Sequence, residues 1–379
     1  MSQNRTIFED VSTDKPTGST PSKGRIDRPA GARKAIRAWL IALFALVVAM
    51  ICVGGLTRLT DSGLSITEWR PVTGALPPMN AEGWNSEFAK YQEIPEYTLQ
   101  NKGMSLSEFK AIYWWEWGHR QLGRVIGLVW AVGFLGFLAA RKIPTGWNKR
   151  LLGIGLLGGL QGAIGWWMVS SGLDGGMLDV ASYRLAVHLG LAFVILGFIA
   201  WYVFLLSRPE AQLLQARRDR NPKLFGLSTG LLHLSFIQIL LGALVAGIDA
   251  GRGFTDWPLM GGHIFPPDPF ALEPLWRNFF EDEGLVQFMH RVAGYLVFIF
   301  GIVVWSRGHA SANGATRRAF DVMGALVAFQ VVLGVVTVMN GAPLALGIAH
   351  QLGAVALWVA VLRARFLAQY PLPQSIRRA

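Results

Sequence analysis

Eight stretches of about 20 apolar residues alternate with polar segments along the chain. An α-helix rises about 1.5 Å per residue, so each stretch is long enough to cross a hydrocarbon layer about 30 Å thick. This pattern predicts an all-α integral membrane protein with eight transmembrane helices. The predicted spans are residues 36–57, 113–140, 151–171, 185–206, 224–248, 285–305, 319–339 and 343–362.

The basic residues cluster at every second end of these spans. The chain is 52% hydrophobic and only 16% charged, yet its formal net charge is +11. Lys and Arg next to transmembrane helices mark the cytoplasmic side, so the distribution predicts cytoplasmic N and C termini. A topology signal therefore explains the charge, and we expect no nucleic-acid partner. The clusters lie within residues 5–37, 141–150, 208–223, 307–318 and 363–378.

The eight spans divide into two similar sets of four. A sequence that begins with Asp and reaches Trp eight residues later follows both the first and the fifth span (69 − 61 and 257 − 249). Because each set has an even number of spans, both sets have the same orientation. We predict two parallel-repeat four-helix bundles. The matched pairs outside the histidines are Asp61 and Asp249, Trp69 and Trp257, Gln161 and Gln330, and Gly165 and Gly334.

Four histidines occupy matched positions in this repeat. His119 and His290 each begin the string His-Arg-x-x-Gly, and His188 corresponds to His350. Counting residues to the cytoplasmic end of each span places all four in or near the outer half of the membrane. Ionisable side chains inside a bilayer are costly and usually functional, and imidazole is a common ligand of heme iron. The pattern predicts one heme between His119 and His188 and a second between His290 and His350.

One difference between the repeats concerns a carboxylate. Glu116 precedes His119 by three residues, so the two side chains share a helix face, whereas the corresponding residue in the second repeat is Gln287. A carboxylate beside a heme edge can accept a proton or stabilise a developing positive charge, and an amide cannot act as such a base. We therefore expect the chemistry in the first repeat, although a carboxylate that is only hydrogen-bonded at the membrane surface remains an alternative.

The domain boundaries follow from the spans. A loop as long as the one after the first span is uncommon in compact proteins and indicates a lid or a docking surface. The predicted segments are a disordered cytoplasmic tail (1–35), an N-terminal four-helix half (36–207) that contains the long outer loop (58–112), a cytoplasmic linker (208–223), a C-terminal four-helix half (224–366) and a cytoplasmic tail (367–379).

The beginning of the long outer loop carries the most specific motif. It reads Gly-Gly-Leu-Thr-Arg at residues 54–58, Glu-Trp at 68–69 and Pro-x-x-Gly-x-x-Pro-Pro at 71–78. Together with Glu116 and the four histidines, this motif resembles heme A synthase, and more closely the branch shared by proteobacteria and mitochondria. The resemblance extends from about residue 36 to residue 366.

The resemblance implies an activity and a role for each site residue. Members of that family oxidise the C8 methyl group of heme O to a formyl group by successive hydroxylations and so supply heme A to terminal oxidases. By resemblance, His290 and His350 bind the iron of a resident heme b, His119 and His188 frame the substrate heme, and Glu116 is catalytic. Some relatives carry a cysteine pair in the first outer loop. This chain has only Cys52, in the first span, so no thiol-based role is carried over.

The remaining expectations concern location, partners and rival functions. We expect a bacterial inner membrane, with the mitochondrial inner membrane as the alternative. Expected partners are heme O, the lipid bilayer, an electron acceptor and, by resemblance, heme O synthase; self-association stays open. The rival functions are a membrane diheme b-type electron-transfer protein and a heme carrier. Two hemes at similar depth argue against electron transfer across the bilayer, and a carrier needs two access states rather than a carboxylate at one site.

Overall fold

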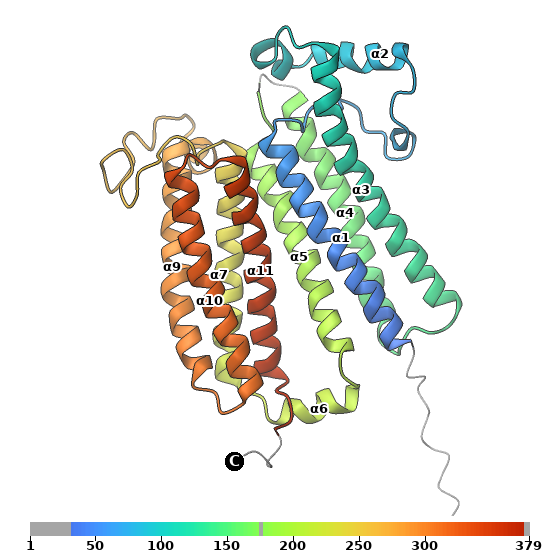
Figure 1. Cartoon of the computed structure of the whole chain (residues 1–379), viewed down its shortest axis with the longest axis vertical. Coiled ribbons are helices and arrows are strands. Elements are labelled where there is room, and N and C mark those ends of the chain that lie inside the picture. Colours follow the sequence, from blue (N-terminus) through green and yellow to red (C-terminus); the bar gives the residue numbers. More distant parts are fainter. Residues whose placement is uncertain (1–31, 174–176, 375–379) are drawn as a thin grey trace, which may run out of the picture.

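Eight long helices form the core of the computed structural model, which describes residues 32–173 and 177–374 (Figure 1). Within these residues the chain contains helices and loops but no β-strand. All eight helices are long and apolar enough to cross a membrane by length and composition. Their bounds are α1 Arg33–Leu59, α3 Leu106–Ala139, α4 Asn148–Leu173, α5 Ser182–Leu206, α7 Pro222–Gly247, α9 Glu283–His309, α10 Gly314–Met339 and α11 Leu344–Gln369.

The predicted spans are confirmed in number and place, and local sequence explains where several helices begin. Asn221, Asp282 and Asn313 each precede a helix and accept a hydrogen bond from a backbone N–H of its first turn. Helix α3 begins at Leu106 rather than near residue 113, because Ser105 and Glu108 form a capping box that extends the helix beyond its apolar part.

The helices form two groups of four. The first half comprises α1, α3, α4 and α5, and the second half comprises α7, α9, α10 and α11 (Figure 1). The neighbour relations match: α1 contacts α3 and α5 as α7 contacts α9 and α11, and α4 contacts α3 and α5 as α10 contacts α9 and α11. Helices α1 and α5 pack against α7 and α11 between the halves. These relations agree with the predicted repeat, which remains a prediction.

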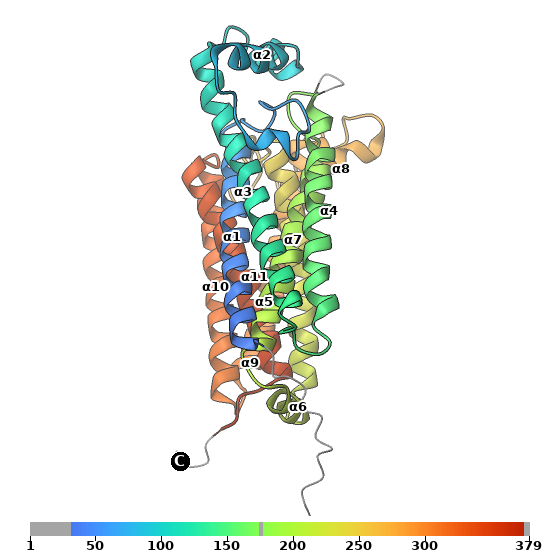
Figure 2. The ribbon, with the colours of Figure 1, turned by 90° about the vertical axis from the view of Figure 1, so that its right-hand side faces the viewer.

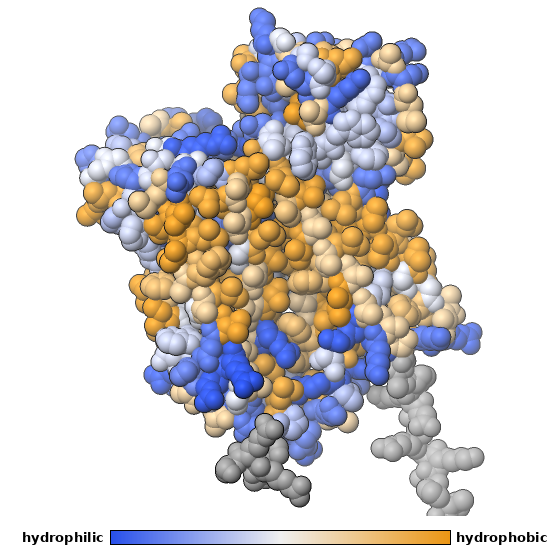
Figure 3. Space-filling view, viewed as in Figure 1, coloured by the Kyte–Doolittle hydropathy of each residue, from blue (hydrophilic) through white to orange (hydrophobic). Residues whose placement is uncertain are grey.

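An apolar belt surrounds the middle of the molecule. Figure 3 shows hydrophobic side chains between two hydrophilic ends. Many large apolar side chains on the long helices are exposed, which water would disfavour and a hydrocarbon layer accommodates. The chain is therefore a multi-pass membrane protein. Exposed examples are Leu128, Val132, Leu156, Ile299 and Val332.

The long outer loop is a folded unit, which we call the cap segment (residues 60–105). It contains α2 (Ala81–Gln92) and two short helical turns (Thr73–Ala75 and Glu96–Gln100). Tyr91 is fully buried against Phe109 of α3, with ring centroids 5.2 Å apart, and Trp84 packs on Tyr113 at 5.0 Å. The cap segment lies at one end of the first half, here called the cap end (Figures 1 and 2).

The opposite end of the bundle carries the connection between the halves. Helix α6 (Glu210–Arg218) lies there, within the predicted linker 208–223, and α1 begins and α11 ends at that same end (Figure 1). The predicted tails 1–35 and 367–379 lie mostly or partly outside the described residues. The assignment of this end to the cytoplasm stays a prediction.

Candidate functional site

All four predicted histidines line one cavity of about 950 Å³. His188, His290 and His350 lie six, seven and six residues from the cap ends of their helices (188 − 182, 290 − 283 and 350 − 344). His119 lies 13 residues into α3 (119 − 106), whose first turns pack against the cap segment. The structure therefore brings the matched histidines to a common cavity, which Glu116 also lines.

The second-half pair has the spacing of two ligands on one metal ion. The ring centroids of His290 and His350 are 6.5 Å apart. A metal–nitrogen bond of about 2 Å on each side separates two ligand nitrogens by about 4 Å, and the radii of the two rings add the remainder. Within the described residues no group of three or more His, Cys, Asp or Glu side chains is arranged to hold a metal. Two imidazoles alone suit iron that already has a macrocycle around it.

A glutamine on the neighbouring helix contacts three of the four histidines. Its side-chain nitrogen donates to the backbone oxygen of the histidine (3.0, 3.0 and 2.7 Å) and lies 3.2, 3.1 and 3.2 Å from Nδ1 of the ring. In the first two sets it also lies 3.3 Å from Nε2 of the ring. Four residues later, a glycine provides space for that ring. The sets, in the same order, are Gln161, Gly165 and His188; Gln238, Gly242 and His290; and Gln330, Gly334 and His350.

The unpaired side-chain oxygens of these three glutamines bear on whether the site suits a bound heme. The Oε1 atoms of Gln161, Gln238 and Gln330 are buried and have no hydrogen-bond partner. A histidine that binds iron through Nε2 carries its proton on Nδ1 and needs an acceptor there, usually supplied by a neighbouring side chain. In all three sets the atom beside Nδ1 is the amide nitrogen, which also donates to the backbone oxygen of the histidine, so the glutamine packs against the imidazole without supplying that acceptor. The fit to heme iron therefore rests on the facing rings of His290 and His350.

Glu116 is fully engaged within the first half. Its Oε2 accepts hydrogen bonds from Ser65 Oγ and from the backbone N–H of Ile66, both at 2.7 Å, and its Oε1 accepts from Arg120 Nε at 3.0 Å. Only 2% of the residue is exposed. Arg120 also donates to two backbone carbonyls of the cap segment. Glu116 is thus a buried carboxylate that faces the cavity and joins α3 to the cap segment.

Gln287 makes the corresponding connection in the second half with the opposite polarity. Its Nε2 donates to the carbonyls of Ala250 and Phe254 at 2.9 and 3.0 Å, and its Oε1 accepts from Arg291 at 3.1 Å. The two residues therefore share a structural task, which the sequence analysis considered only for Glu116. They differ in their ionisable groups, because the first half has a buried carboxylate paired with Arg120 and the second half has a neutral amide beside Arg291.

The first half also has more space beside its histidines. Gly158 and Gly162 of α4 line the cavity and have nothing within 4 Å of an added Cβ. With the repeat offset of 169 (330 − 161), the corresponding residues of α10 are Val327 and Val331, which also line the cavity. Replacing two valines with two glycines removes two branched side chains from one wall.

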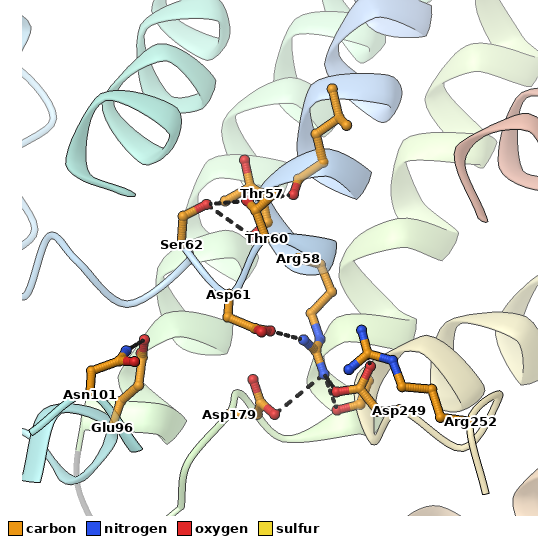
Figure 4. A network of polar contacts seen from close by, with 12 residues as sticks. Thr57, Arg58, Thr60, Asp61, Ser62, Glu96, Asn101, Asp179, Asp249 and Arg252 are labelled. Carbon is orange, nitrogen blue, oxygen red and sulfur yellow. Dashed lines mark hydrogen bonds and ion pairs between the residues drawn. The ribbon is translucent and has the colours of Figure 1, made fainter. Parts of the chain in front are cut away.

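An ion-pair network that we call the seam network joins the halves at the cap end (Figure 4). Arg58 contacts Asp61 at 2.8 Å, Asp249 at 3.0 Å and Asp179 at 3.3 Å, and 10% of its side chain is exposed. Asp61 and Asp249 follow α1 and α7 with a positive φ (49° and 53°), a conformation that Asp tolerates better than most residues. The sequence identified both aspartates as repeat markers and Arg58 as part of the loop motif, but it did not predict that the arginine pairs with them. With an offset of 188, the second-half equivalent of Arg58 is Ala246.

Together, the fold and the cavity define a class: a multi-pass helical membrane protein in which four histidines line one cavity and His290 and His350 have the spacing of two ligands on one metal ion. More specifically, the chain belongs to the COX15-CtaA family of cytochrome oxidase assembly proteins, whose model matches residues 37–362. It is 67% identical over 377 residues to a heme A synthase of Ruegeria sp. (strain TM1040), covering 99% of both chains. It is 62% identical to a heme A synthase of Ruegeria pomeroyi over the full length of both, and 59% identical to one of Paracoccus denitrificans over 98% of both. The resemblance predicted from the motifs is confirmed.

Proposed function

We propose that this protein is a heme A synthase, which oxidises the C8 methyl group of heme O to a formyl group by successive hydroxylations. The full-length similarity to heme A synthases supports the overall reaction. The assignment of the substrate to the first half and of the cofactor to the second half rests on one observation. The buried carboxylate of Glu116 lines the cavity where the second half has Gln287.

The first half binds the substrate in this proposal. His119 and His188 frame heme O, and Glu116 faces its reacting edge. The glycines of α4 provide space for a macrocycle that carries a bulky farnesyl chain. Because that chain is lipophilic, heme O enters from the bilayer between the helices.

Glu116 acts mainly as a fixed charge. Its four hydrogen bonds use both oxygens, and Arg120 holds one of them, so the carboxylate is already oriented before substrate binds. An oriented anion in a cavity of low polarity stabilises positive charge that develops at the methyl carbon. Ser65, whose hydroxyl donates to Glu116, completes the arrangement.

The second half retains a cofactor. His290 and His350 hold a resident heme b, and Gln238 and Gln330 orient the two rings. Bound there, a heme b supplies a one-electron acceptor beside the substrate site. His290 and His350 would hold that group, and an external electron acceptor is the proposed partner.

The proposed setting is the inner membrane of a bacterium, with both termini in the cytoplasm and the cap end outside. Heme O synthase is the proposed source of substrate. The cap segment closes the cap end of the first half and provides the surface on which such a partner docks.

Heme extraction tests this function against its rivals. The full-length protein is expressed with and without heme O synthase in cells that lack their own heme A synthase, and extracted hemes are separated by chromatography. We expect formyl-heme only when both proteins are present. An electron-transfer protein or a heme carrier yields no formyl-heme, and that result with a folded, heme-containing protein contradicts the proposal.

A further inference from the structure

The fourth histidine lacks the glutamine that contacts the other three. The offset of 188 that relates Asp61 to Asp249 also relates Gly54 to Gly242 and Met50 to Gln238. The structure places these residues alike. Gly54 abuts the ring of His119 as Gly242 abuts that of His290. The end of the Met50 side chain lies 3.5 Å from a Cβ added at Gly123 of α3. The end of the Gln238 side chain lies 3.3 Å from a Cβ added at the corresponding Gly294 of α9.

His119 is consequently the least restrained of the four rings. Among the described residues, no side chain hydrogen-bonds to it, whereas Gln161, Gln238 and Gln330 contact the other three. Its orientation differs as well. The ring atom nearest to a Cβ added at the adjoining glycine is Nε2 at 3.2 Å, whereas the other three rings present Cε1. This difference corresponds to a half-turn of the imidazole about its Cβ–Cγ bond.

A missing polar neighbour weakens a histidine as an iron ligand. A polar side chain that contacts the ring restrains its orientation, and losing such an outer contact of a metal-binding histidine typically lowers metal affinity by about 10–100-fold. A thioether is only a weak hydrogen-bond acceptor and cannot replace an amide in this role. Met50 has about the same length as glutamine, so the difference lies in polarity rather than in space.

We propose that Met50 is a positioning residue that keeps His119 an exchangeable ligand, so that the first half releases its heme while the second half retains its own. This inference rests on the proposed function, because a synthase must discharge its product heme and keep its cofactor. It adds a cause of that difference which lies outside the four histidines and Glu116.

Reciprocal substitutions between the halves test this role. The variants are Met50→Gln, which creates the missing contact, Gln238→Met, which removes it beside His290, and Met50→Leu, which keeps an apolar side chain as the matched control. Each purified full-length protein, carrying its resident heme and loaded with heme O, is mixed with excess apomyoglobin. Chromatography of the remaining hemes follows the loss of heme O and heme b separately.

We expect Met50→Gln to slow the release of heme O by roughly 10-fold or more and to leave the loss of heme b unchanged. Gln238→Met should accelerate the loss of heme b by a similar factor and shift the b-type absorption spectrum, and Met50→Leu should behave like the original protein. Equal release of heme O from the Met50→Gln and Met50→Leu proteins overturns the proposal, provided that both retain the resident b-type spectrum. Absence of formyl-heme in the original protein contradicts the function instead, and it leaves the release rates interpretable.

Discussion

The two halves share a framework and differ where chemistry requires it. Each half places two histidines near the cap end of its helices and joins a loop to its second helix through one buried polar side chain. The first half has a carboxylate at that position, an apolar neighbour beside one histidine and glycines along one wall. The second half has an amide, glutamines beside both histidines and valines along that wall.

All of these differences favour a retained heme in the second half and a heme that reacts and leaves in the first half. Glutamine contacts and a filled wall restrain a bound macrocycle, which suits a retained cofactor. A buried charge, open space and an unrestrained ligand are unfavourable for retention but favourable for a substrate that must react and leave. A duplicated heme site can therefore become a reaction site when the glutamine contact and the filled wall are removed, as well as when a carboxylate is added.

Removing a ligand from either half should separate the two sites most strongly. His290→Ala and His350→Ala should each abolish the resident b-type absorption, because one imidazole of a facing pair is lost, and formyl-heme formation should disappear with it. His119→Ala and His188→Ala should retain that spectrum and lose only the conversion. Absorption spectroscopy of the purified proteins measures this directly. Unchanged spectra in both second-half variants would place the cofactor elsewhere.

Replacing the carboxylate should have the next largest effect. Glu116→Gln removes the anion while keeping its size, and the new amide NH₂ faces either the donors Ser65 and Ile66 or the donor Arg120, while the amide oxygen still accepts from the other side. We expect formyl-heme formation to fall by roughly 10²–10⁴-fold with the resident b-type spectrum intact.

The matched control in the other half is Gln287→Ala, which removes the same structural connection without removing a charge. It should reduce the conversion less than Glu116→Gln does. Heme chromatography after equal incubation with heme O quantifies both. Similar losses in the two variants would show that Glu116 serves only to hold the cap segment.

The sequence predicted the helices and the histidines because both depend on local composition and on the repeat. The apolar periodicity specified eight spans, and the matched positions of His119 and His290 selected the ligands. The repeat also identified Gln161 with Gln330. Gln238 was not predicted, because the corresponding residue of the first half is Met50. Identical residues at matched positions reveal only what the two repeats share, and this position differs between them.

The contacts made by the cap segment were not predictable in the same way. The partners of Glu116 are Ser65 and Ile66, about 50 residues earlier, and no periodic pattern relates a loop residue to a helix at that separation. Arg120, four residues after Glu116, was the one partner that helix geometry indicates. Likewise, the seam network depends on Arg58, which meets three aspartates only after the halves have packed together.

The loops at the cap end of the two halves also differ in their acid–base behaviour. The cap segment encloses Glu96, which is 3% exposed and accepts a hydrogen bond from Tyr91 at 3.0 Å. Glu96 also accepts one from Asn101 at 3.2 Å (Figure 4). The loop between α7 and α9 is held by the fully buried Asn278, which exchanges hydrogen bonds with Leu272. One loop thus depends on an ionisable group and the other on a neutral amide.

Burial raises the pKa of Glu96 to about 8, and the nearby Asp179, Glu116 and Asp61 add to this, while the hydrogen bond from Tyr91 opposes it. The folded cap segment therefore binds a proton that the unfolded segment releases near pH 4. A raised pKa contributes stability that is fully present below the unfolded value and is lost as pH rises through about 8. In the other loop, backbone N–H groups of Gly262 and Gly261 lower the pKa of Asp256, so its contribution does not change at alkaline pH.

Raising the pH from 7 to 9 should accordingly destabilise the cap segment by about 1.4 kcal/mol, or roughly tenfold in its local opening. Amide hydrogen exchange, expressed as protection factors to remove the intrinsic effect of pH, should show this loss in residues 60–105 and not in residues 248–282. Glu96→Gln should abolish the pH dependence, because the amide mimics the protonated carboxyl, whereas Glu93→Gln, at an exposed position of the same segment, should preserve it. Equal pH dependence in both loops, or its persistence in Glu96→Gln, would show that the ionisation of Glu96 does not distinguish the two halves.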